Sequence, residues 1–540
     1  MVRYVVAVIA IFLWSMMTVF SSPKGTGGSE THLSTTDLRI QHFKTANGRD
    51  GWQVDLPGRF QLATPCVVDG MVYIGGGFGS YEFYAFDAIS GRPIWRIKVN
   101  DDGPTAAVVE DGYCVFNTES CTIFVVEART GKMVWSRWLG DPLMSQPALA
   151  KGRIYMAYPG EGGHHLVCLA VKDGYQYWDK RIAGDIISAP VVDKENDLVY
   201  LTTFDGTVYC YETGDGTLQW SKQYRATSAP SIVNGQVYVS QREGDDKPYE
   251  GLTVLGKGGK IITGLMDKRK APQIDITVQT SSEFQGKNMN DSGVVGFPSA
   301  PPAAKAQSAE SNVGQNSVSG LWGYQGSRLT VTGGYSYATR GDTYQVYNIK
   351  DNKVVWEKKI DGDVSKVGGH LASPPIVAGN WSVIGTVNGE ILCFDNDTGR
   401  TEWSHKIEQS IRFQPAVMDG RIYVGTTGGR LVCVDTGNKE LTGWPMWGGD
   451  ASHNGSTQTR SEAVQVKPVP DGVIVKIPKP TPGTNTPDIH ITINNPANQT
   501  ATIFASPVVI AVCAVGVIFV LMLVIIIIYS LTANRSGRKE

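Results

Sequence analysis

Metal-binding residue types lie close together at one point of the 540-residue chain, in the run Glu161-Gly-Gly-His164-His165. Imidazole nitrogens and carboxylate oxygens are ligands that zinc accepts in proteins. However, neighbouring residues of a strand point to opposite faces, so both histidines seldom reach one ion. We therefore expect a plain loop here and predict no metal site.

Tryptophans are frequent, and an indole ring can stack on a sugar or a quinone. Yet Trp95, Trp135, Trp178 and Trp220 follow one another at intervals of 40, 43 and 42 residues, which indicates a repeated structural unit. We expect the tryptophans in this register to dock one unit on the next: Trp52, Trp95, Trp135, Trp178, Trp220, Trp356, Trp403 and Trp444. Trp322 and Trp381 fall outside the register and are candidates for binding.

Six of the eight cysteines fall into two groups. Cys168, Cys210, Cys393 and Cys433 lie ten or eleven residues before a tryptophan of the register. They should occupy equivalent places in different sheets, about 10 Å apart, too far for a disulfide. Cys114 and Cys121 are predicted to face each other across one hairpin, where either a disulfide or two thiols would fit.

Each repeat unit contains two hairpins. The first has a small residue, a proline, an apolar strand and a tyrosine, as in Ser228-Ala-Pro230 through Tyr238. The second has a strand, an acidic or amide residue, a glycine and a tryptophan, as in Phe86-Asp87 through Trp95. Four strands in about 40 to 45 residues are typical of one propeller blade.

The first-half motif marks eight blade starts. They lie near Pro65, Ala106, Pro147, Pro190, Pro230, Gly320, Pro375 and Pro415. We therefore predict an all-β, eight-bladed β-propeller of four-stranded antiparallel blades over 51–450. Because the run that begins at Trp52 resembles the run that begins at Trp403, it could supply the eighth blade's outer strand and leave no free sheet edge.

Both ends of the chain carry membrane signals. An uncharged stretch over 4–20 follows Arg3 and precedes small residues, which predicts a signal peptide over 1–21, with an uncleaved anchor as the alternative. A second uncharged stretch predicts a transmembrane helix over 506–531. The basic residues of 532–540 follow it, so this tail should be cytoplasmic. The predicted topology is a single-pass type I membrane protein with its propeller on the extracellular, lumenal or periplasmic side.

Three further segments differ from the repeats in composition. Residues 22–50 are expected to form a linker. An insertion at about 265–317 is rich in Ser, Asn, Gly and Pro, and we expect it to be disordered. A proline-rich stalk over 451–505 should hold the propeller away from the membrane.

Function is expected on one face of the ring. In a propeller each inner strand starts beside the central channel, so residues just before the repeat prolines should line one face, here named the channel face. The predicted binding candidates are Arg59, Gln61, Asp141, Gln146, Arg225, Trp322, His370, Trp381, Arg412 and Gln414. They are donors and acceptors of mixed charge, and no catalytic constellation is recognised among them.

The repeats resemble the pyrroloquinoline-quinone (PQQ)-type repeat family. Its blades carry an Ala-x-Asp-x-x-x-Gly-x-x-x-Trp motif, matched here by Ala85, Asp87, Gly91 and Trp95, and the run 444–450 is similar to a closing motif of such propellers. The resemblance covers about 400 of the 540 residues. The family includes quinoprotein dehydrogenases, BamB-like outer-membrane assembly lipoproteins and sensor domains, so the fold leaves the function open.

These observations favour a non-catalytic protein-binding or assembly scaffold with a protein partner and no cofactor. With 49 basic and 51 acidic residues and no basic run in the folded region, a nucleic-acid partner is not indicated. The alternative that the resemblance implies is a membrane-tethered quinoprotein dehydrogenase that binds PQQ and calcium and oxidises an alcohol or sugar. Many such enzymes use adjacent cysteines beside the quinone, whereas no two cysteines are neighbours here. A passive surface-layer component is a third reading.

Overall fold

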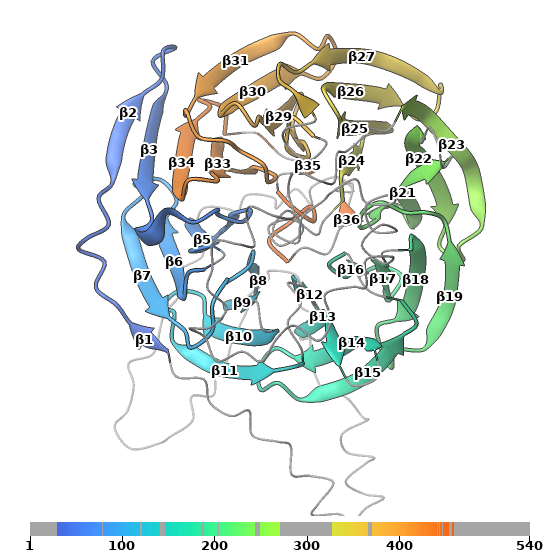
Figure 1. The fold of residues 1–540 in the computed structure, drawn as a ribbon, viewed down its shortest axis with the longest axis horizontal. Coiled ribbons are helices and arrows are strands. Elements are labelled where there is room, and N and C mark those ends of the chain that lie inside the picture. Colours follow the sequence, from blue (N-terminus) through green and yellow to red (C-terminus); the bar gives the residue numbers. More distant parts are fainter. Residues whose placement is uncertain are drawn as a thin grey trace, which may run out of the picture. The chain divides into compact units, whose positions relative to one another are not determined.

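The computed structural model describes residues 30–77, 79–118, 121–140, 146–160, 163–184, 188–203, 205–243, 249–270, 327–364, 370–439, 441, 443–444, 446–452 and 456–457. Their strands form eight sheets that surround a common centre as blades (Figure 1). The predicted eight-bladed propeller of four-stranded antiparallel blades is confirmed. Within these residues no helix has the length and apolar character needed to cross a membrane. The segments 1–21, 506–531 and 532–540 lie outside the described residues.

The first four blades follow one another along the chain. Blade one holds β4 (Cys66–Val68), β5 (Met71–Gly75), β6 (Glu82–Asp87) and β7 (Pro93–Lys98). Blade two holds β8 (Val108–Glu110), β9 (Tyr113–Asn117), β10 (Thr122–Glu127) and β11 (Met133–Trp138). Blade three holds β12 (Ala148–Ala150), β13 (Arg153–Gly160), β14 (Gly163–Ala170) and β15 (Gln176–Ile182). Blade four holds β16 (Val191–Asp193), β17 (Leu198–Thr202), β18 (Thr207–Glu212) and β19 (Leu218–Gln223).

The second half of the ring completes the set. Blade five holds β20 (Ser231–Val233), β21 (Gln236–Glu243), β22 (Tyr249–Gly256) and β23 (Ile261–Lys270). Blade six holds β24 (Leu329–Thr332), β25 (Tyr335–Arg340), β26 (Thr343–Asn348) and β27 (Lys353–Lys359). Blade seven holds β28 (Ile376–Ala378), β29 (Trp381–Gly385), β30 (Glu390–Asp395) and β31 (Thr401–Lys406). Blade eight holds β32 (Ala416–Met418), β33 (Arg421–Gly425), β34 (Arg430–Asp435) and the N-terminal β3 (Asp50–Asp55), which the 3-10 turn η1 (Pro57–Arg59) follows.

The sequence motifs explain where the strands begin and turn. Six inner strands start directly after a repeat proline, as β4 does after Pro65 and β12 after Pro147. In the sixth blade the inner strand starts at Leu329, and the predicted start near Gly320 lies outside the described residues. The turn from β8 to β9 places Asp111 and Gly112 at φ angles of 50° and 81°. Two successive positive φ angles define the tight hairpin turn that Asp-Gly favours.

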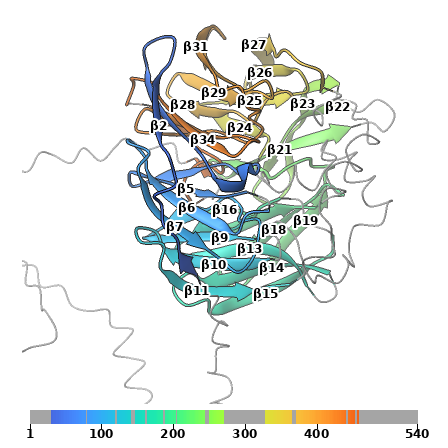
Figure 2. The same cartoon turned by 60° about the vertical axis from the view of Figure 1, so that its left-hand side comes forward.

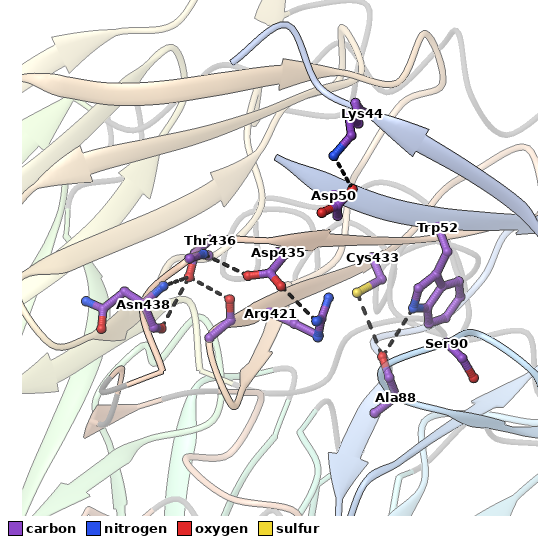
Figure 3. A network of polar contacts seen from close by, with 12 residues as sticks. Lys44, Asp50, Trp52, Ala88, Ser90, Arg421, Cys433, Asp435, Thr436 and Asn438 are labelled. Carbon is purple, nitrogen blue, oxygen red and sulfur yellow. Dashed lines mark hydrogen bonds and ion pairs between the residues drawn. The ribbon is translucent and has the colours of Figure 1, made fainter. Parts of the chain in front are cut away.

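The N-terminal strand closes the ring, as predicted. β3 pairs antiparallel with β34, and Trp52 lies opposite Cys433. The indole Nε1 of Trp52 donates to the backbone oxygen of Ala88 in blade one at 3.2 Å (Figure 3). Residues 22–50, predicted as a linker, also contain strands: β2 (Gln41–Lys44) covers the outer edge of β3, and β1 (Thr31–His32) covers that of β7 (Figures 1 and 2).

Six tryptophans dock each blade on its neighbour in the same way. Each Nε1 donates to a backbone oxygen in the next blade, in the pairs Trp52–Ala88, Trp95–Ala128, Trp135–Val171, Trp178–Thr213, Trp220–Lys257 and Trp356–Asn396. The same rings lie against a turn glycine of that blade, namely Gly91, Gly131, Gly174, Gly216, Gly259 and Gly399. The Gly-x-x-x-Trp repeat thus encodes both halves of the contact, because the glycine of one blade receives the ring of the blade before it.

Two junctions depart from this pattern. Blade eight takes its outer strand from the N-terminus, and among the described residues Trp403 Nε1 has no hydrogen-bond partner. The guanidinium of Arg49 lies over the Trp403 ring instead, 5.3 Å from its centroid. The other exception is the junction between blades five and six, because β23 contains no tryptophan.

Trp444 does not lie in the outer strand of a blade, where the tryptophan register had placed it. It lies in β35 (Gly443–Trp444), which pairs with the inner strand β28 rather than with an outer strand. The position expected for it in blade eight, opposite Cys433, is taken by Trp52. The spacing between Cys433 and Trp444 gave a wrong prediction, because the outer strand of blade eight that pairs with β34 is β3, from the N-terminal part of the chain.

The residues after Trp444 line the centre of the ring. Val109 N donates to Ala451 O at 2.7 Å, Leu149 N donates to Ser452 O at 2.9 Å, and β36 (Ser456–Thr457) pairs with β20. Trp447 is 2 % exposed and packs with alanines that precede three inner strands and with Phe413. The beginning of the predicted stalk 451–505 is therefore joined to propeller strands, and β35 and β36 lie near the centre in Figure 1.

The cysteines take the places that the repeat predicts, with one exception. Cys168, Cys210 and Cys393 lie opposite Trp178, Trp220 and Trp403, and all are free thiols. Cys114 and Cys121 are also free and buried, so they form no disulfide. Cys114 lies opposite Val126 rather than Cys121. The predicted facing is wrong because the loop is closed by a hydrogen bond from Thr118 N to Thr122 O, which places Cys121 inside the loop.

The docking contact can be tested with two glycines of blade two. Gly131 has a φ of 72°, and a Cβ there would lie 2.7 Å from the Trp95 ring, whereas Gly112 has a φ of 81° and nothing within 4 Å of a Cβ. Both Gly→Ala changes strain the backbone, but only Gly131→Ala must also displace the ring. We expect Gly131→Ala to lower the free energy of unfolding by about 1–3 kcal/mol more than Gly112→Ala, measured by urea denaturation of the full chain. Equal losses would show that the ring contact is not tight.

Candidate functional site

The predicted channel-face residues do not form one open surface. Arg59 is exposed, Gln61, Arg225 and Arg412 are half-buried, and Gln146, His370 and Gln414 are buried. Asp141 and Trp322 lie outside the described residues. Gln414 Nε2 donates to Pro375 O at 2.6 Å and so ties blade eight to blade seven. Gln414 therefore helps to hold two blades together.

Trp381 belongs to the other end of its blade. It begins β29, after the turn that follows the inner strand β28, and it packs against the core between blades seven and eight. The channel face is where β28 starts, so the prediction of Trp381 as a channel-face residue is wrong. Its place outside the tryptophan register reflects its position beside the turn of the β28–β29 hairpin.

His164 and His165 lie in strand β14 rather than in a loop. His165 Nδ1 is 2.7 Å from Asp179 Oδ1, and the Tyr158 hydroxyl donates to the same carboxylate. Glu161 lies outside the described residues. Among the described residues no three His, Cys, Asp or Glu side chains gather as metal ligands.

A buried group of charged residues marks the channel-face end of the junction between blades five and six. It comprises Arg242, Glu250, Asp267, Arg328, Arg340, Gln345 and His370, here named the charge cluster. These residues come from the strand ends of blades five and six and from the segments that precede β24 and β28. The cluster therefore lies at the one junction whose outer strand lacks a docking tryptophan.

Asp267 of β23 connects the two blades. Its carboxylate accepts from Arg340 Nη1 at 2.5 Å and from Gln345 Nε2, and its side chain is 3 % exposed. Asp267 has a φ of 52°, a left-handed conformation that is uncommon outside glycine, at an irregular point of the β22–β23 pairing. This conformation turns the carboxylate towards blade six. A second ion pair, Arg269 Nη2 to Glu357 Oε2 at 2.7 Å, crosses the junction nearer its exposed edge.

Glu250 is the second buried carboxylate of the charge cluster. Arg242 Nε lies 3.4 Å from Glu250 Oε2, both side chains are 3 % exposed, and Ser240 Oγ donates to Glu250 Oε1 at 2.9 Å. Burial by itself raises the pKa of Glu250, but the charge of Arg242 and the other nearby cations outweigh it and lower the pKa to about 2. Glu250 is therefore ionised at neutral pH.

His370 is the only predicted site residue within the charge cluster. It is 8 % exposed and bridges to Gly341, directly after Arg340. Burial, followed by the charge of Arg328, holds the pKa of His370 well below its usual value, although Glu250 acts in the opposite direction. The imidazole is therefore neutral at pH 7.

Sequence reasoning missed Arg242, Glu250, Asp267 and Arg340. One local signal was present: Tyr238, Ser240 and Arg242 alternate along β21, so a charged residue continues the buried face of that strand. The partners could not be found this way, because Arg340 and Asp267 are 73 positions apart in sequence.

The state of His370 can be tested through stability. Because its pKa is lowered on folding, the unfolded chain binds the proton first, and stability declines as the pH falls below about 6.5. Over pH 6.5 to 5 this residue should contribute up to about 1.4 kcal/mol per pH unit, and His370→Gln should remove that contribution. Urea denaturation of the full chain at pH 7.5, 6.5 and 5.5 measures it. The exposed His32→Gln serves as control, and identical slopes for His370→Gln and wild type would contradict the assignment.

Comparison with known proteins places the propeller in a family. The family model described as "Outer membrane protein assembly factor BamB" matches residues 36–142, 119–264 and 303–438. These ranges cover more than half of the chain and contain all the docking tryptophans that donate to a neighbouring blade.

Individual relatives are distant. Outer membrane protein assembly factor BamB of Nitrosomonas eutropha is 24% identical over 231 residues, which cover 39% of this chain and 53% of that protein. The chain thus spans about half the length of this relative. Outer membrane protein assembly factor BamB of Burkholderia pseudomallei is 23% identical over 398 residues, covering 72% and 86%. Quinohemoprotein alcohol dehydrogenase ADH IIB of Pseudomonas putida is 22% identical over 484 residues, covering 70% and 69%.

Among solved structures, BamB of Moraxella catarrhalis is 14% identical, with a TM-score of 0.46 over 74% of this chain and 98% of that one. The strand order, the tryptophan docking and the family match agree with one another. The chain belongs to the family of PQQ-like repeat propellers described as outer membrane protein assembly factor BamB.

Proposed function

We propose that this chain is a membrane-anchored, extracytoplasmic propeller that acts as a non-catalytic protein-binding or assembly scaffold. The observation that carries the proposal is the filled centre of the ring. Trp447 is buried there among Ala63, Ala106, Ala189 and Phe413, and the following residues bond to inner strands. Small ligands bind in concave sites, so a filled centre favours recognition by the outer surface of the channel face.

The use of the channel-face polar groups supports the same role. Gln414 Nε2 and Thr330 Oγ1 both donate to Pro375 O, and Ser373 Oγ accepts from Gly385 N. These groups stiffen the ring instead of serving as acids, bases or nucleophiles. The exposed residue Arg59 and the half-buried Arg225 and Arg412 remain at the surface as contacts for a partner, together with the part of the predicted insertion that follows Lys270. The first residues of that insertion, 265–270, were expected to be disordered but belong to β23.

Membrane attachment in this proposal rests on the apolar segment 506–531 and the basic residues that follow it. A tether of this kind would display the propeller on the outer side of the membrane beside its partner. The assembly role named for the BamB relatives supports a protein partner of this chain.

Partner capture tests the channel face with two matched arginines. Arg59 on the channel face and Arg400 in the turn before β31 have side chains that are 74% and 76% exposed. The full chain is crosslinked in its native membrane, extracted in detergent and captured, and its partners are quantified. We expect Arg59→Glu to reduce partner yield at least about tenfold, as loss of an interfacial charge contact does, and Arg400→Glu to leave it unchanged. The reverse pattern, or equal yields, would place the contact elsewhere.

The insertion is tested separately by deletion of 275–315 from the full chain. We expect this deletion to lower partner yield without changing the thermal unfolding temperature, because it lies between β23 and β24 and leaves every described strand in place. Unchanged partners would remove the insertion from the contact surface.

The alternative function is a membrane-tethered quinoprotein dehydrogenase, which the likeness to the Pseudomonas putida enzyme supports. It requires that the full chain, supplied with PQQ and calcium, gain a quinone absorbance band and reduce a dye with an alcohol or sugar as donor. The non-catalytic proposal requires neither signal. Stable quinone binding with turnover would overturn it.

A further inference from the structure

The outer strand of blade six has a free edge. β27 is the last strand of its sheet, and among the described residues no strand pairs with its outer edge (Figure 1). Six of its seven residues, all but Trp356, are exposed. An edge strand presents backbone N–H and C=O groups that the sheet itself does not use, so it can accept a further strand. β27 therefore offers a row of backbone hydrogen bonds at the surface.

Apolar side chains are exposed on the same strand. Val354 and Val355, the two residues before the docking tryptophan of β27, are 40% and 41% exposed. At the corresponding positions of blades one and two, Ile94 and Met133 are half-buried and pack against the core. Apolar residues at these positions are thus better covered in blades one and two than in blade six.

Other outer strands of the same arc differ from β27. In blade three the guanidinium of Arg153 lies over the Tyr177 ring, 4.2 Å from its centroid. β19 exposes a single large apolar residue, Leu218. β23 exposes Ile261 and Ile262, but it leads directly into residues outside the described part of the chain. β27 combines two exposed valines with described residues on both sides.

The chain itself adds a fifth strand to an outer edge elsewhere on the ring. β2 pairs antiparallel with the outer strand β3 of blade eight. Lys44 of β2 lies opposite Asp50 of β3, and Lys44 Nζ is 2.7 Å from Asp50 Oδ1 (Figure 3). Phe43 of β2 stacks on His405 of blade seven with ring centroids 5.1 Å apart. Backbone pairing, a cross-strand ion pair and contact with a neighbouring blade therefore hold an added strand on this rim.

The charges on β27 have the opposite sign to the charge that Asp50 provides on β3. Lys353 and Lys358 are exposed, and among the described residues they have no ion-pair partner. Glu357 is already paired with Arg269 of blade five. The β26 residues opposite the two lysines are four positions apart, so both lysines lie on one face of the sheet. Carboxylates on an added strand would complement this edge, because opposite charges across a strand pair attract.

We propose that the free edge of β27 is a docking site for an extended segment of a partner protein, in which two carboxylates flank apolar β-branched residues. The segment pairs with β27 as a fifth strand, with its carboxylates opposite Lys353 and Lys358. Its apolar side chains cover Val354 and Val355. A second copy of β27 does not supply these carboxylates, because its one acidic residue, Glu357, is already paired. The site is separate from the channel-face contacts and does not depend on them.

A short fluorescent peptide with capped ends and the core Glu-Thr-Val-Val-Glu is the probe. Its glutamates are four positions apart, as the lysines of β27 require. Binding to the full chain is measured by fluorescence anisotropy at low ionic strength. We expect saturable binding, and at least about tenfold weaker binding of the core Lys-Thr-Val-Val-Lys, because two attractive cross-strand pairs become repulsive.

Backbone methylation separates strand addition from simple charge attraction. The glutamate peptide with N-methyl groups on alternate residues of the edge that faces β27 keeps its charges but loses the donors that strand pairing needs. It should bind at least about tenfold more weakly than the unmodified peptide. Equal affinity of these two peptides, or of the glutamate and lysine peptides, would overturn the proposal.

A charge reversal on the chain locates the contact. Lys358→Glu should weaken the glutamate peptide at least about threefold and strengthen the lysine peptide, because it reverses one cross-strand pair. The control Lys406→Glu alters an exposed lysine of the outer strand β31 in blade seven and should change neither affinity. Hydrogen exchange should show protection by the glutamate peptide in β27 and not in β31. The same response in both variants, or protection elsewhere, contradicts docking on β27.

Two other occupants of the edge are tested with the same peptide. If deletion of 275–315 raises its affinity at least about tenfold, the insertion already occupies the edge. If the full chain dimerises in detergent and the peptide dissociates the dimer, a second copy occupies it. Either result rules out the partner segment. Unchanged affinity after the deletion, together with no dimer that the peptide dissociates, supports it.

Discussion

The whole ring depends on one contact, in which an indole ring of one blade lies on a left-handed turn glycine of the next. The indole N–H bonds to a backbone oxygen of that same turn, so apolar packing and a hydrogen bond together constrain the angle between adjacent blades at six junctions. A closed ring tolerates little variation in this angle, because errors at successive junctions would add up. The small residues opposite the tryptophans, such as Cys168 and Cys210, follow from this contact, since a larger side chain would push the ring away from the glycine.

Charged and polar residues are buried at the junction between blades five and six, where the tryptophan–glycine contact is absent. Between blades five and six, Asp267, Arg340 and Gln345 take over the connection, and buried ion pairs seldom stabilise more than well-packed apolar residues would. The other junctions carry enough apolar docking to hold the ring while this one bears charge. Apolar side chains pack at this junction as well, since Leu252 and Met266 of blade five share one buried cluster with Leu329 of blade six, so the charged residues add to a packed contact.

The sequence predicts those parts of this molecule that are local and periodic. The spacing of Trp95, Trp135 and Trp178 is enough to fix the blade length, and the likeness of Trp52 to Trp403 is enough to find the closing strand. Contacts between distant segments left no such trace. Arg340 donates a hydrogen bond to Asp267, which lies 73 positions earlier in the chain. The strand that contains Trp444 pairs with the inner strand β28. In the β9–β10 hairpin Cys114 lies opposite Val126 and not opposite Cys121, which the sequence alignment had predicted. In each case a pairing across space, rather than a propensity along the chain, decides the outcome.

Closure by the N-terminal strand also sets an order in time. Trp52 pairs with Cys433, so the edge of β3 that faces β34 has no partner until about 380 more residues have left the ribosome, and only β2 can pair with β3 before then. At typical synthesis rates this interval is roughly 20 to 75 s, during which this edge of β3 and the Trp52 indole lack the strand against which they pack. Blade eight is therefore the last to form, although it contains some of the first residues made. A folding helper that shields β3 over this interval would serve this protein better than one that acts on its finished blades.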